Sequence, residues 1–257
     1  MRSIALCIVL AAVTVPAAHG EPFDDAVELY RLAMIEDVGQ ALSGARDLRD
    51  KLSQQDIAGA RKAWIDARVG WERSEVFTSG FVPELDEAID AWPDAAAGFH
   101  GIEAKLFGAN PADIGDEADA LIARLADLDA HVRTMKLTPQ GLLDGVVRLA
   151  YEIGDSKVDG GESRLSGTSL NDMRNNADGI DLAYRTLFAA KLDVVDRALA
   201  DRVQSDIGRI RALLQVADLK NVDADGLRKT SEALIVTLQA AAPELGLGTP
   251  TLEAAAK

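Results

Sequence analysis

The sequence predicts an all-α protein, and three observations lead to that fold class. From Phe23 onward, apolar residues recur at three- and four-residue spacing, which is the period of an amphipathic helix. No stretch alternates apolar and polar residues for long enough to be a strand. The 257 residues include only 8 prolines and 5% aromatic residues, a composition that favours helices over sheets.

We expect eight helices, joined by short polar connections and two irregular segments. Asn110 and Thr138 are suitable N-caps, because each precedes a proline that fits the first helical position. The irregular segments are residues 80–94 and 158–168, and the tail after Pro243 is expected to be loose. The expected helices span residues 24–52, 56–78, 95–107, 111–135, 139–157, 169–200, 202–218 and 223–242.

The first 20 residues have the pattern of a secretory signal peptide. Arg2 precedes an apolar run that is too short to span a bilayer, and small residues then lead to an expected cleavage before Glu21. We therefore expect an exported protein that lies outside the cytoplasm. Cys7, the sole cysteine, lies in this segment, so the mature chain has no thiolate ligand and no cysteine nucleophile.

The chain is strongly acidic. Its formal net charge is −15, which becomes −16 when the first 20 residues are removed. An acidic balance without a basic block argues against nucleic acid and anionic membrane surfaces as main partners.

The expected helix 56–78 directs carboxylates toward its own apolar stripe, which includes Trp71. On a helical wheel, Glu75 falls in the middle of this stripe and Glu72 on its shoulder. Carboxylates that project from facing helices build the metal sites of helical bundles. An internal ion pair with Arg68, four residues before Glu72, explains the same pattern equally well.

The expected helix 95–107 carries His100 and Glu103, which share a face because they are three residues apart. Glu103 falls within an apolar arc, where a carboxylate needs a hydrogen bond, an ion-pair partner or a metal ion. Imidazole and carboxylate donors suit iron, zinc, copper or manganese better than calcium or magnesium. A buried hydrogen bond between the two is the alternative. Asp86 and Asp90, in the preceding segment, are further oxygen ligands, solvated acids or a helix cap.

These motifs resemble the signatures of the imelysin-like family, in particular its EfeO/EfeM-type branch of periplasmic iron-uptake proteins. Residues 99–108 are similar to the Gly-Phe-His-x-Ile-Glu signature. Residues 71–75 resemble the aromatic-Glu-x-x-Glu motif and residues 85–90 the Leu-Asp-x-x-Ile-Asp motif. Several stretches of residues 137–170 resemble the second signature block. The resemblance covers most of the mature chain in order.

The resemblance implies two packed four-helix bundles and a metal site near the His-x-x-Glu motif. We expect one domain over residues 21–257, with bundle halves of roughly 21–136 and 137–257. Gly167 and Ser169 stand where related iron proteins often carry a histidine and an acid, which argues against a second metal site. The expected ligands are His100, Glu103, Glu72, Glu75 and Asp86, and the second-block candidates are Glu152 and Glu162.

The function implied is that of a non-enzymatic periplasmic component that binds iron for uptake. The expected cargo is a divalent or trivalent metal ion, with iron first and zinc or copper as alternatives. An inner-membrane iron permease and a periplasmic haem peroxidase are the implied protein partners.

Two other functions stay open at this point. The family carries a peptidase label, but His100 has no second histidine four residues away, which a zinc-peptidase helix requires. Binding of alginate or another acidic polysaccharide would use basic clusters such as Arg46 and Arg49. The net negative charge of the chain opposes that binding over long range.

Overall fold

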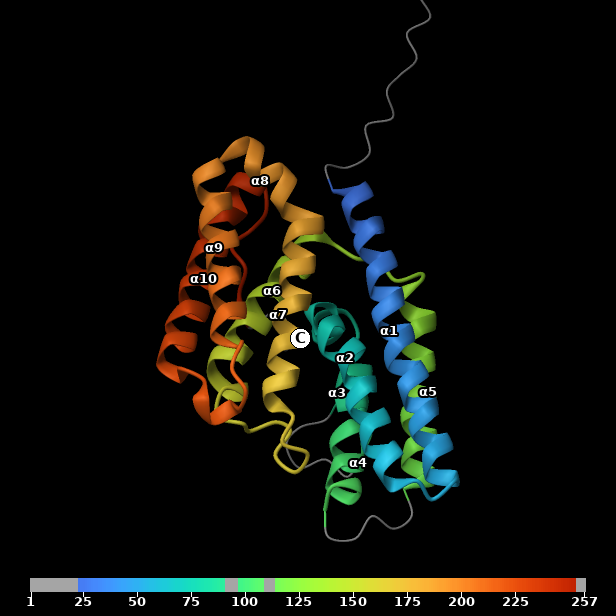
Figure 1. The fold of residues 1–257 in the computed structure, drawn as a ribbon. Coiled ribbons are helices and arrows are strands. Elements are labelled where there is room, and N and C mark those ends of the chain that lie inside the picture. Colours follow the sequence, from blue (N-terminus) through green and yellow to red (C-terminus); the bar gives the residue numbers. More distant parts are fainter. Residues whose placement is uncertain (1–22, 91–96, 109–113, 253–257) are drawn as a thin grey trace, which may run out of the picture.

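A computed structural model describes residues 23–90, 97–108 and 114–252. These residues are largely helical, and no strand occurs among them. The helices lie in two groups side by side (Figure 1). The predicted all-α fold of two packed four-helix bundles is confirmed. In the described part of the chain, no helix has the length and apolar character needed to span a bilayer.

The first bundle contains three long helices and two short ones. Helix α1 packs along both α2 and α5, and the short helices α3 and α4 contact α2 and α5. Their bounds are α1 Asp24–Ser53, α2 Ile57–Phe81, α3 Pro83–Asp90, α4 Gly98–Leu106 and α5 Gly115–Val132.

The second bundle contains α6, α7, α9 and α10, with the short helix α8 between α7 and α9. Two of its helices end in π-helical turns, η1 after α6 and η2 after α7. The bounds are α6 Pro139–Glu152, η1 Ile153–Lys157, α7 Ser169–Ala183, η2 Tyr184–Phe188, α8 Ala189–Val195, α9 Arg197–Leu213, the 3-10 turn η3 Leu219–Asn221 and α10 Ala224–Leu245.

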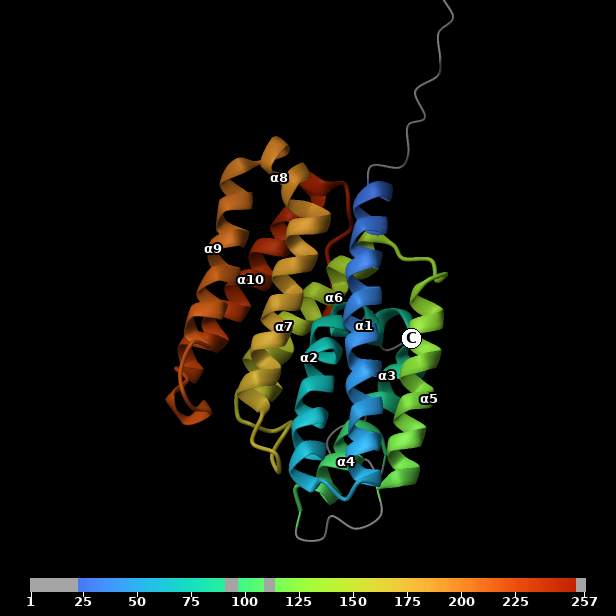
Figure 2. The ribbon, with the colours of Figure 1, turned by 45° about the vertical axis from the view of Figure 1, so that its right-hand side comes forward.

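Helix α2 belongs to the first bundle and forms its contact with the second, since it packs against α1 on one side and against α6 and α7 on the other (Figure 2). Two glycines permit this close packing. A Cβ atom on Gly145 would lie 1.7 Å from the carbonyl oxygen of Val76, and one on Gly179 would lie 2.5 Å from that of Arg73. Since both bundles cover α2, it buries polar as well as apolar side chains.

Three features of the fold differ from the sequence-based expectation. Helix α3 forms within residues 80–94, where eight helical residues are too few for a periodic pattern to be recognised. The break before α9 comes at Asp196, because its side chain caps that helix by accepting a hydrogen bond from Leu199 N at 2.9 Å. The part of the tail that the structure describes, up to residue 252, is attached and not loose, since Gly248 N donates to Oε1 of Gln140 at 2.7 Å.

The two predicted helix caps have different outcomes. The cap at Thr138 is confirmed, because its hydroxyl accepts a hydrogen bond from Gly141 N at 3.1 Å. The cap at Asn110 and the proline after it lie outside the described residues, as does the expected signal peptide.

Candidate metal centre

A buried cluster of polar and charged side chains lies where α2, α3, α4, η1, α7 and the 158–168 segment meet. All of these side chains except Glu75 are almost completely excluded from solvent. The members are Arg68, Glu72 and Glu75 from α2, Asp90 from α3, His100 and Glu103 from α4, Lys157 from η1, Glu162 from the 158–168 segment, and Asp172 and Asn176 from α7.

Glu103 holds the His100 imidazole through one ring nitrogen. Nδ1 of His100 lies 3.0 Å from Oε2 of Glu103, and we assign the hydrogen to Nδ1 because an ionised carboxylate can only accept. The other carboxylate oxygen, Oε1, accepts hydrogen bonds from Leu165 N at 3.1 Å, Ser166 N at 2.8 Å and Ser166 Oγ at 2.7 Å. The 158–168 segment therefore fixes Glu103 and, through it, the orientation of the ring.

The second ring nitrogen, Nε2, is buried and makes no hydrogen bond. It lies 3.2 Å from Oδ1 of Asp90, outside the angular range of a hydrogen bond. Asp90 is held in place by Nη1 of Arg68 and Nε1 of Trp71, each at 2.7 Å. With the hydrogen on Nδ1, a neutral His100 directs the Nε2 lone pair toward this carboxylate, an arrangement that a cation between them would stabilise.

Arg68 is fully buried and is surrounded by carboxylates. Its guanidinium pairs with Glu72 on its own helix and with Asp90 at 2.7 Å, Glu162 at 3.3 Å and Asp172 at 3.5 Å. The ion pair that the sequence offers as an alternative to metal binding is therefore present at Glu72. The five donors of a guanidinium explain how one cation can hold acids from four elements together.

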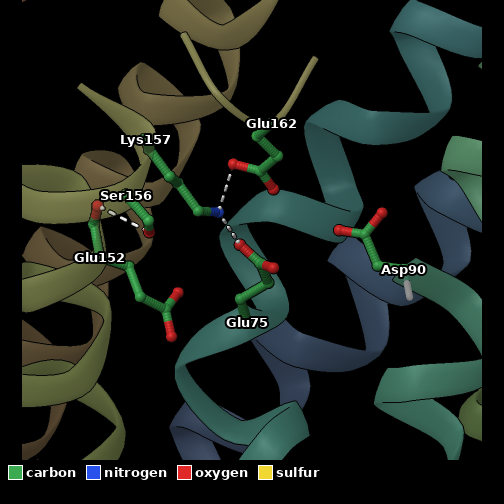
Figure 3. A pocket seen from close by; sticks show the side chains of 6 residues that line it. All are labelled: Glu75, Asp90, Glu152, Ser156, Lys157 and Glu162. Atoms are coloured by element: carbon green, nitrogen blue, oxygen red, sulfur yellow. Dashed lines mark hydrogen bonds and ion pairs between the residues drawn. The ribbon is translucent and has the colours of Figure 1, made fainter. Parts of the chain in front are cut away.

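Lys157 occupies a second position among carboxylates (Figure 3). Its Nζ lies 2.8 Å from Oε2 of Glu75, 3.1 Å from Oε2 of Glu162 and 3.2 Å from Oε2 of Glu72. Asn176 Nδ2 donates to the same oxygens of Glu72 and Glu75, at 2.9 and 2.7 Å. These contacts bring α2, η1, α7 and the 158–168 segment together around a single ammonium group.

The acids of the cluster do not all ionise readily together. Burial raises the pKa of Glu162 to about 8, and the charge of Glu72 adds to this rise. Burial and the charge of Glu72 also raise the pKa of Glu75 well above its usual value. Burial alone would raise the pKa of Glu72 too, but the charges of Arg68 and Lys157 hold it below its usual value. The cluster thus carries more carboxylates than its two cations can neutralise.

A partly open cavity of about 240 Å³ borders the cluster, and four of its six lining residues are acids. Figure 3 shows Lys157 extended between Glu75 and Glu162, with Asp90 on one side of the cavity and Glu152 on the other. A cation in this cavity would lie close to the carboxylate oxygens of these four acids.

The structure brings four of the expected ligand residues, together with Asp90, into two groups of three. Within each group, one ligand atom from each residue lies within 4.8 Å of the others, and Glu162 belongs to both groups. Glu103 adjoins the group that contains His100, because its carboxylate accepts a hydrogen bond from the His100 ring. The groups are Asp90, His100 and Glu162, and Glu72, Glu75 and Glu162.

Asp86 and Glu152 belong to neither group. Asp86 lies one turn before Asp90 on α3, and burial raises its pKa to about 6. Glu152 lines the cavity and pairs with Arg148 at 3.5 Å. Glu162 is a candidate ligand from the second signature block, and it lies among ligand residues of the first block. Both blocks therefore contribute side chains to one cluster.

The expected ligand set does not include Lys157, Asp172 or Asn176. Asp172 and Asn176 are four residues apart and lie on the same stripe of α7 as Ile180, a pattern from which their burial could have been predicted. No such pattern exists for Lys157, because the π-helical turn η1 changes the direction in which its side chain points.

The fold and the cluster together define a class: an all-α protein with a buried histidine-and-carboxylate centre suited to a cation. The model of the imelysin family, which is also designated peptidase M75, matches residues 26–97 and 94–245. The chain therefore belongs to the imelysin family, as the motifs predicted.

Its relatives include iron-uptake components. The chain is 29% identical over 213 residues to the iron uptake system component EfeM of Pseudomonas syringae, which covers 79% of this chain and 73% of the relative. It is 30% identical over 201 residues to an EfeM/EfeO family lipoprotein of Staphylococcus haemolyticus. This match covers 74% of this chain and 68% of the relative. It is 29% identical over 219 residues to the iron uptake system component EfeO of Yersinia pestis. This match covers 79% of this chain and 58% of the relative.

The fold has also been seen in a solved structure. That structure is of a putative iron-regulated protein A precursor from Parabacteroides distasonis, with a TM-score of 0.68 and 15% sequence identity. The match covers 86% of this chain and 95% of that one. The likeness supports the fold and, at this identity, nothing beyond it.

Proposed function

We propose that this chain is a periplasmic component of an iron-uptake system, which binds a metal ion and passes it on without catalysing a reaction. The names of its relatives, iron uptake system components EfeM and EfeO, support the association with iron uptake. The metal ion is cargo in this proposal. Iron is the favoured ion, as Fe²⁺ or Fe³⁺, and zinc and copper are the alternatives, because one imidazole and several carboxylates form a mixed nitrogen and oxygen donor set.

One observation carries the proposal, namely the convergence of His100 Nε2 with the carboxylates of Asp90 and Glu162. The nitrogen is buried and makes no hydrogen bond, and each of the three residues comes from a different segment. Burying a ring nitrogen without a hydrogen bond is costly, and a metal ion would bind this nitrogen together with the two carboxylates, which Arg68 holds beside it.

Glu103 would orient the ring in this proposal. Both of its oxygens are already engaged, one by His100 and the other by the 158–168 segment. A carboxylate behind a metal-binding imidazole fixes its tautomer and raises its basicity. Glu72 and Glu75 form a second candidate group with Glu162, whose oxygens Lys157 contacts in this structure. Asp86 and Glu152, which lie outside both groups, remain candidate ligands.

The arrangement of the histidines favours binding over peptide hydrolysis. His131, the other histidine of the described residues, lines a different surface hollow together with Asp127 and residues 81–85. A zinc-peptidase helix would need a second imidazole beside His100. We propose that metal-loaded protein does not cleave unstructured peptides. Turnover that scales with protein and disappears in Glu103→Gln would overturn this part of the proposal.

The location and partners follow from the same function. A periplasmic protein exported through residues 1–20 would deliver its ion to an inner-membrane iron permease, with a periplasmic haem peroxidase as a further partner. N-terminal sequencing of protein from the native host should find Glu21 first, and a retained Met1 would contradict export.

Iron-limited growth tests the function as a whole. We expect deletion of the gene to slow growth of the native host when iron is scarce, and wild-type protein to restore it. His100→Ala should fail to restore growth, whereas the matched control His131→Ala should succeed. Rescue by His100→Ala as complete as that by the wild type would contradict the proposal.

A further inference from the structure

The group formed by Glu72, Glu75 and Glu162 already holds a cation, which is the side chain of Lys157. Its ammonium nitrogen contacts one oxygen of each acid, at distances between 2.8 and 3.2 Å. A metal ion bound to these three carboxylates would occupy the same region, since the three oxygens lie within 4.8 Å of one another.

The other group differs in this respect. Nε2 of His100 makes no hydrogen bond, and no lysine contacts Asp90 among the described residues. Arg68 contacts both Asp90 and Glu162, but it also bonds Glu72 and Asp172 and is fully buried, so it has no room to withdraw. The group of Glu72, Glu75 and Glu162 is therefore filled by a lysine of the protein itself, whereas the other group contains a ring nitrogen that makes no hydrogen bond.

Lys157 has the means to move. It is the last residue of η1, and π-helical turns of this kind are often found at functional positions. Its side chain lines the cavity of about 240 Å³ that borders the cluster, which gives the ammonium a place to go. Unlike a guanidinium, an ammonium on a flexible four-carbon chain is not fixed in one bidentate geometry.

We propose that Lys157 is a tethered cation that occupies a second metal position, formed by Glu72, Glu75 and Glu162, and excludes metal from it. This inference rests on the proposed function, in which the cargo ion binds Asp90, His100 and Glu162. Because Glu162 serves both groups, the ammonium also competes with the cargo ion for that carboxylate. Lys157 limits the protein to one ion, and its ammonium retains or regains Glu162 when that ion departs.

The test is the number of metal ions bound by Lys157→Met. Titration calorimetry with Zn²⁺, confirmed by native mass spectrometry, should give one equivalent for wild-type protein and two for the variant. Adding Glu75→Gln to Lys157→Met should remove the second equivalent. Lys191→Met is the matched control, because Nζ of Lys191 bonds the carbonyl oxygen of Leu245, away from the cluster, and this variant should bind one equivalent.

A second variant distinguishes the loss of the ammonium charge from misfolding. Lys157→Gln carries no charge but its amide can still donate to a carboxylate, so it should fold and also bind one equivalent more than the wild type. Circular dichroism verifies folding of each variant. Wild-type stoichiometry in the folded variants, at unchanged or raised affinity, would overturn the inference while leaving the proposed function intact. If instead the wild type binds no metal ion, the proposed function fails, and one equivalent gained by Lys157→Met would still support the second position.

Discussion

Nδ1 of His100 lies 3.0 Å from Oε2 of Glu103, and this contact turns the opposite ring nitrogen toward Asp90. The pair is a buried hydrogen bond, which is what the sequence offers as the alternative to a metal ligand pair. It is also the arrangement in which a carboxylate prepares an imidazole to bind a metal ion. The two interpretations are therefore compatible.

Replacing Glu103 by glutamine should weaken metal binding without unfolding the protein. A glutamine has only one oxygen, so it cannot both accept from the His100 ring and satisfy the donors of Ser166. We expect the dissociation constant for Fe²⁺, measured anaerobically by calorimetry, to rise by about 10- to 100-fold. Glu87→Gln, at an exposed position of α3, should bind like the wild type. An unchanged constant in Glu103→Gln would show that the pair has no part in binding.

Removing the charge of Arg68 should destabilise the fold strongly. Arg68→Met leaves buried carboxylates, including Glu72 and Asp172, without their partner. Loss of one partner from a buried ion pair costs about 3–5 kcal/mol, which urea denaturation of the metal-free protein would measure. Arg197→Met, which breaks only exposed pairs with Asp193 and Asp201, should change stability by no more than about 1 kcal/mol. Equal effects of the two variants would contradict this account of the cluster.

The metal-free protein should lose stability as the pH rises from 6 to 8. Burial raises the pKa of Glu162 from 4.5 to about 8, so in this range the folded protein keeps a proton that the unfolded chain has released. The stability linked to this proton is complete below pH 4.5 and is lost as the pH passes through 8. Glu72 and Asp90 act in the opposite direction only at lower pH, because their pKa values are lowered.

Urea denaturation at pH 6, 7 and 8 in the presence of a chelator measures this loss. Glu162→Gln, which cannot ionise, should flatten the dependence, although Glu75 will retain part of it because its pKa is raised too. A stability that rises between pH 6 and 8 would mean that Glu162 is ionised in the folded protein throughout this range.

The contact between α2 and α6 leaves no space for a methyl group at Gly145. A Cβ atom there would lie 1.7 Å from the carbonyl oxygen of Val76, so one of the helices has to shift. We expect Gly145→Ala to cost about 1–3 kcal/mol in thermal or urea unfolding. Gly208→Ala, in the exposed face of α9 where nothing lies within 4 Å, should instead stabilise by about 0.5–1 kcal/mol. Stabilisation by Gly145→Ala would show that the helices are not in close contact there.

Sequence periodicity was sufficient to predict the fold class and most of the helices, because long amphipathic helices repeat their pattern many times. The helical wheel was less informative for α2. It places Glu75 in the middle of the buried stripe and Glu72 on the shoulder, whereas the Glu72 side chain is fully buried and that of Glu75 is 14% exposed. A wheel assumes one buried face, and α2 is covered by helices of both bundles.

The candidate site was predicted in part. The acids and the histidine stand out because charged groups interrupt apolar arcs, and their grouping follows from helices that face one another. Lys157 could not be found in this way, since its role depends on the π-helical turn η1 and on contacts with residues 82 and 85 positions earlier in the chain. The hydrogen bonds from Ser166 to Glu103 come from a segment without periodicity, which a wheel cannot describe.

Metal-induced thermal stabilisation of wild type and His100→Ala is the most direct test of the central claim. At a hundredfold excess of Fe²⁺ or Zn²⁺ over the dissociation constant, binding should stabilise the wild type by about 2.7 kcal/mol, or roughly 5–10 °C. His100→Ala should keep its helical circular dichroism and lose most of this shift, while His131→Ala should keep it. If wild type and His100→Ala respond identically to each metal ion, the His100–Glu103 pair is only a hydrogen bond in the core, and the metal centre does not exist where we place it.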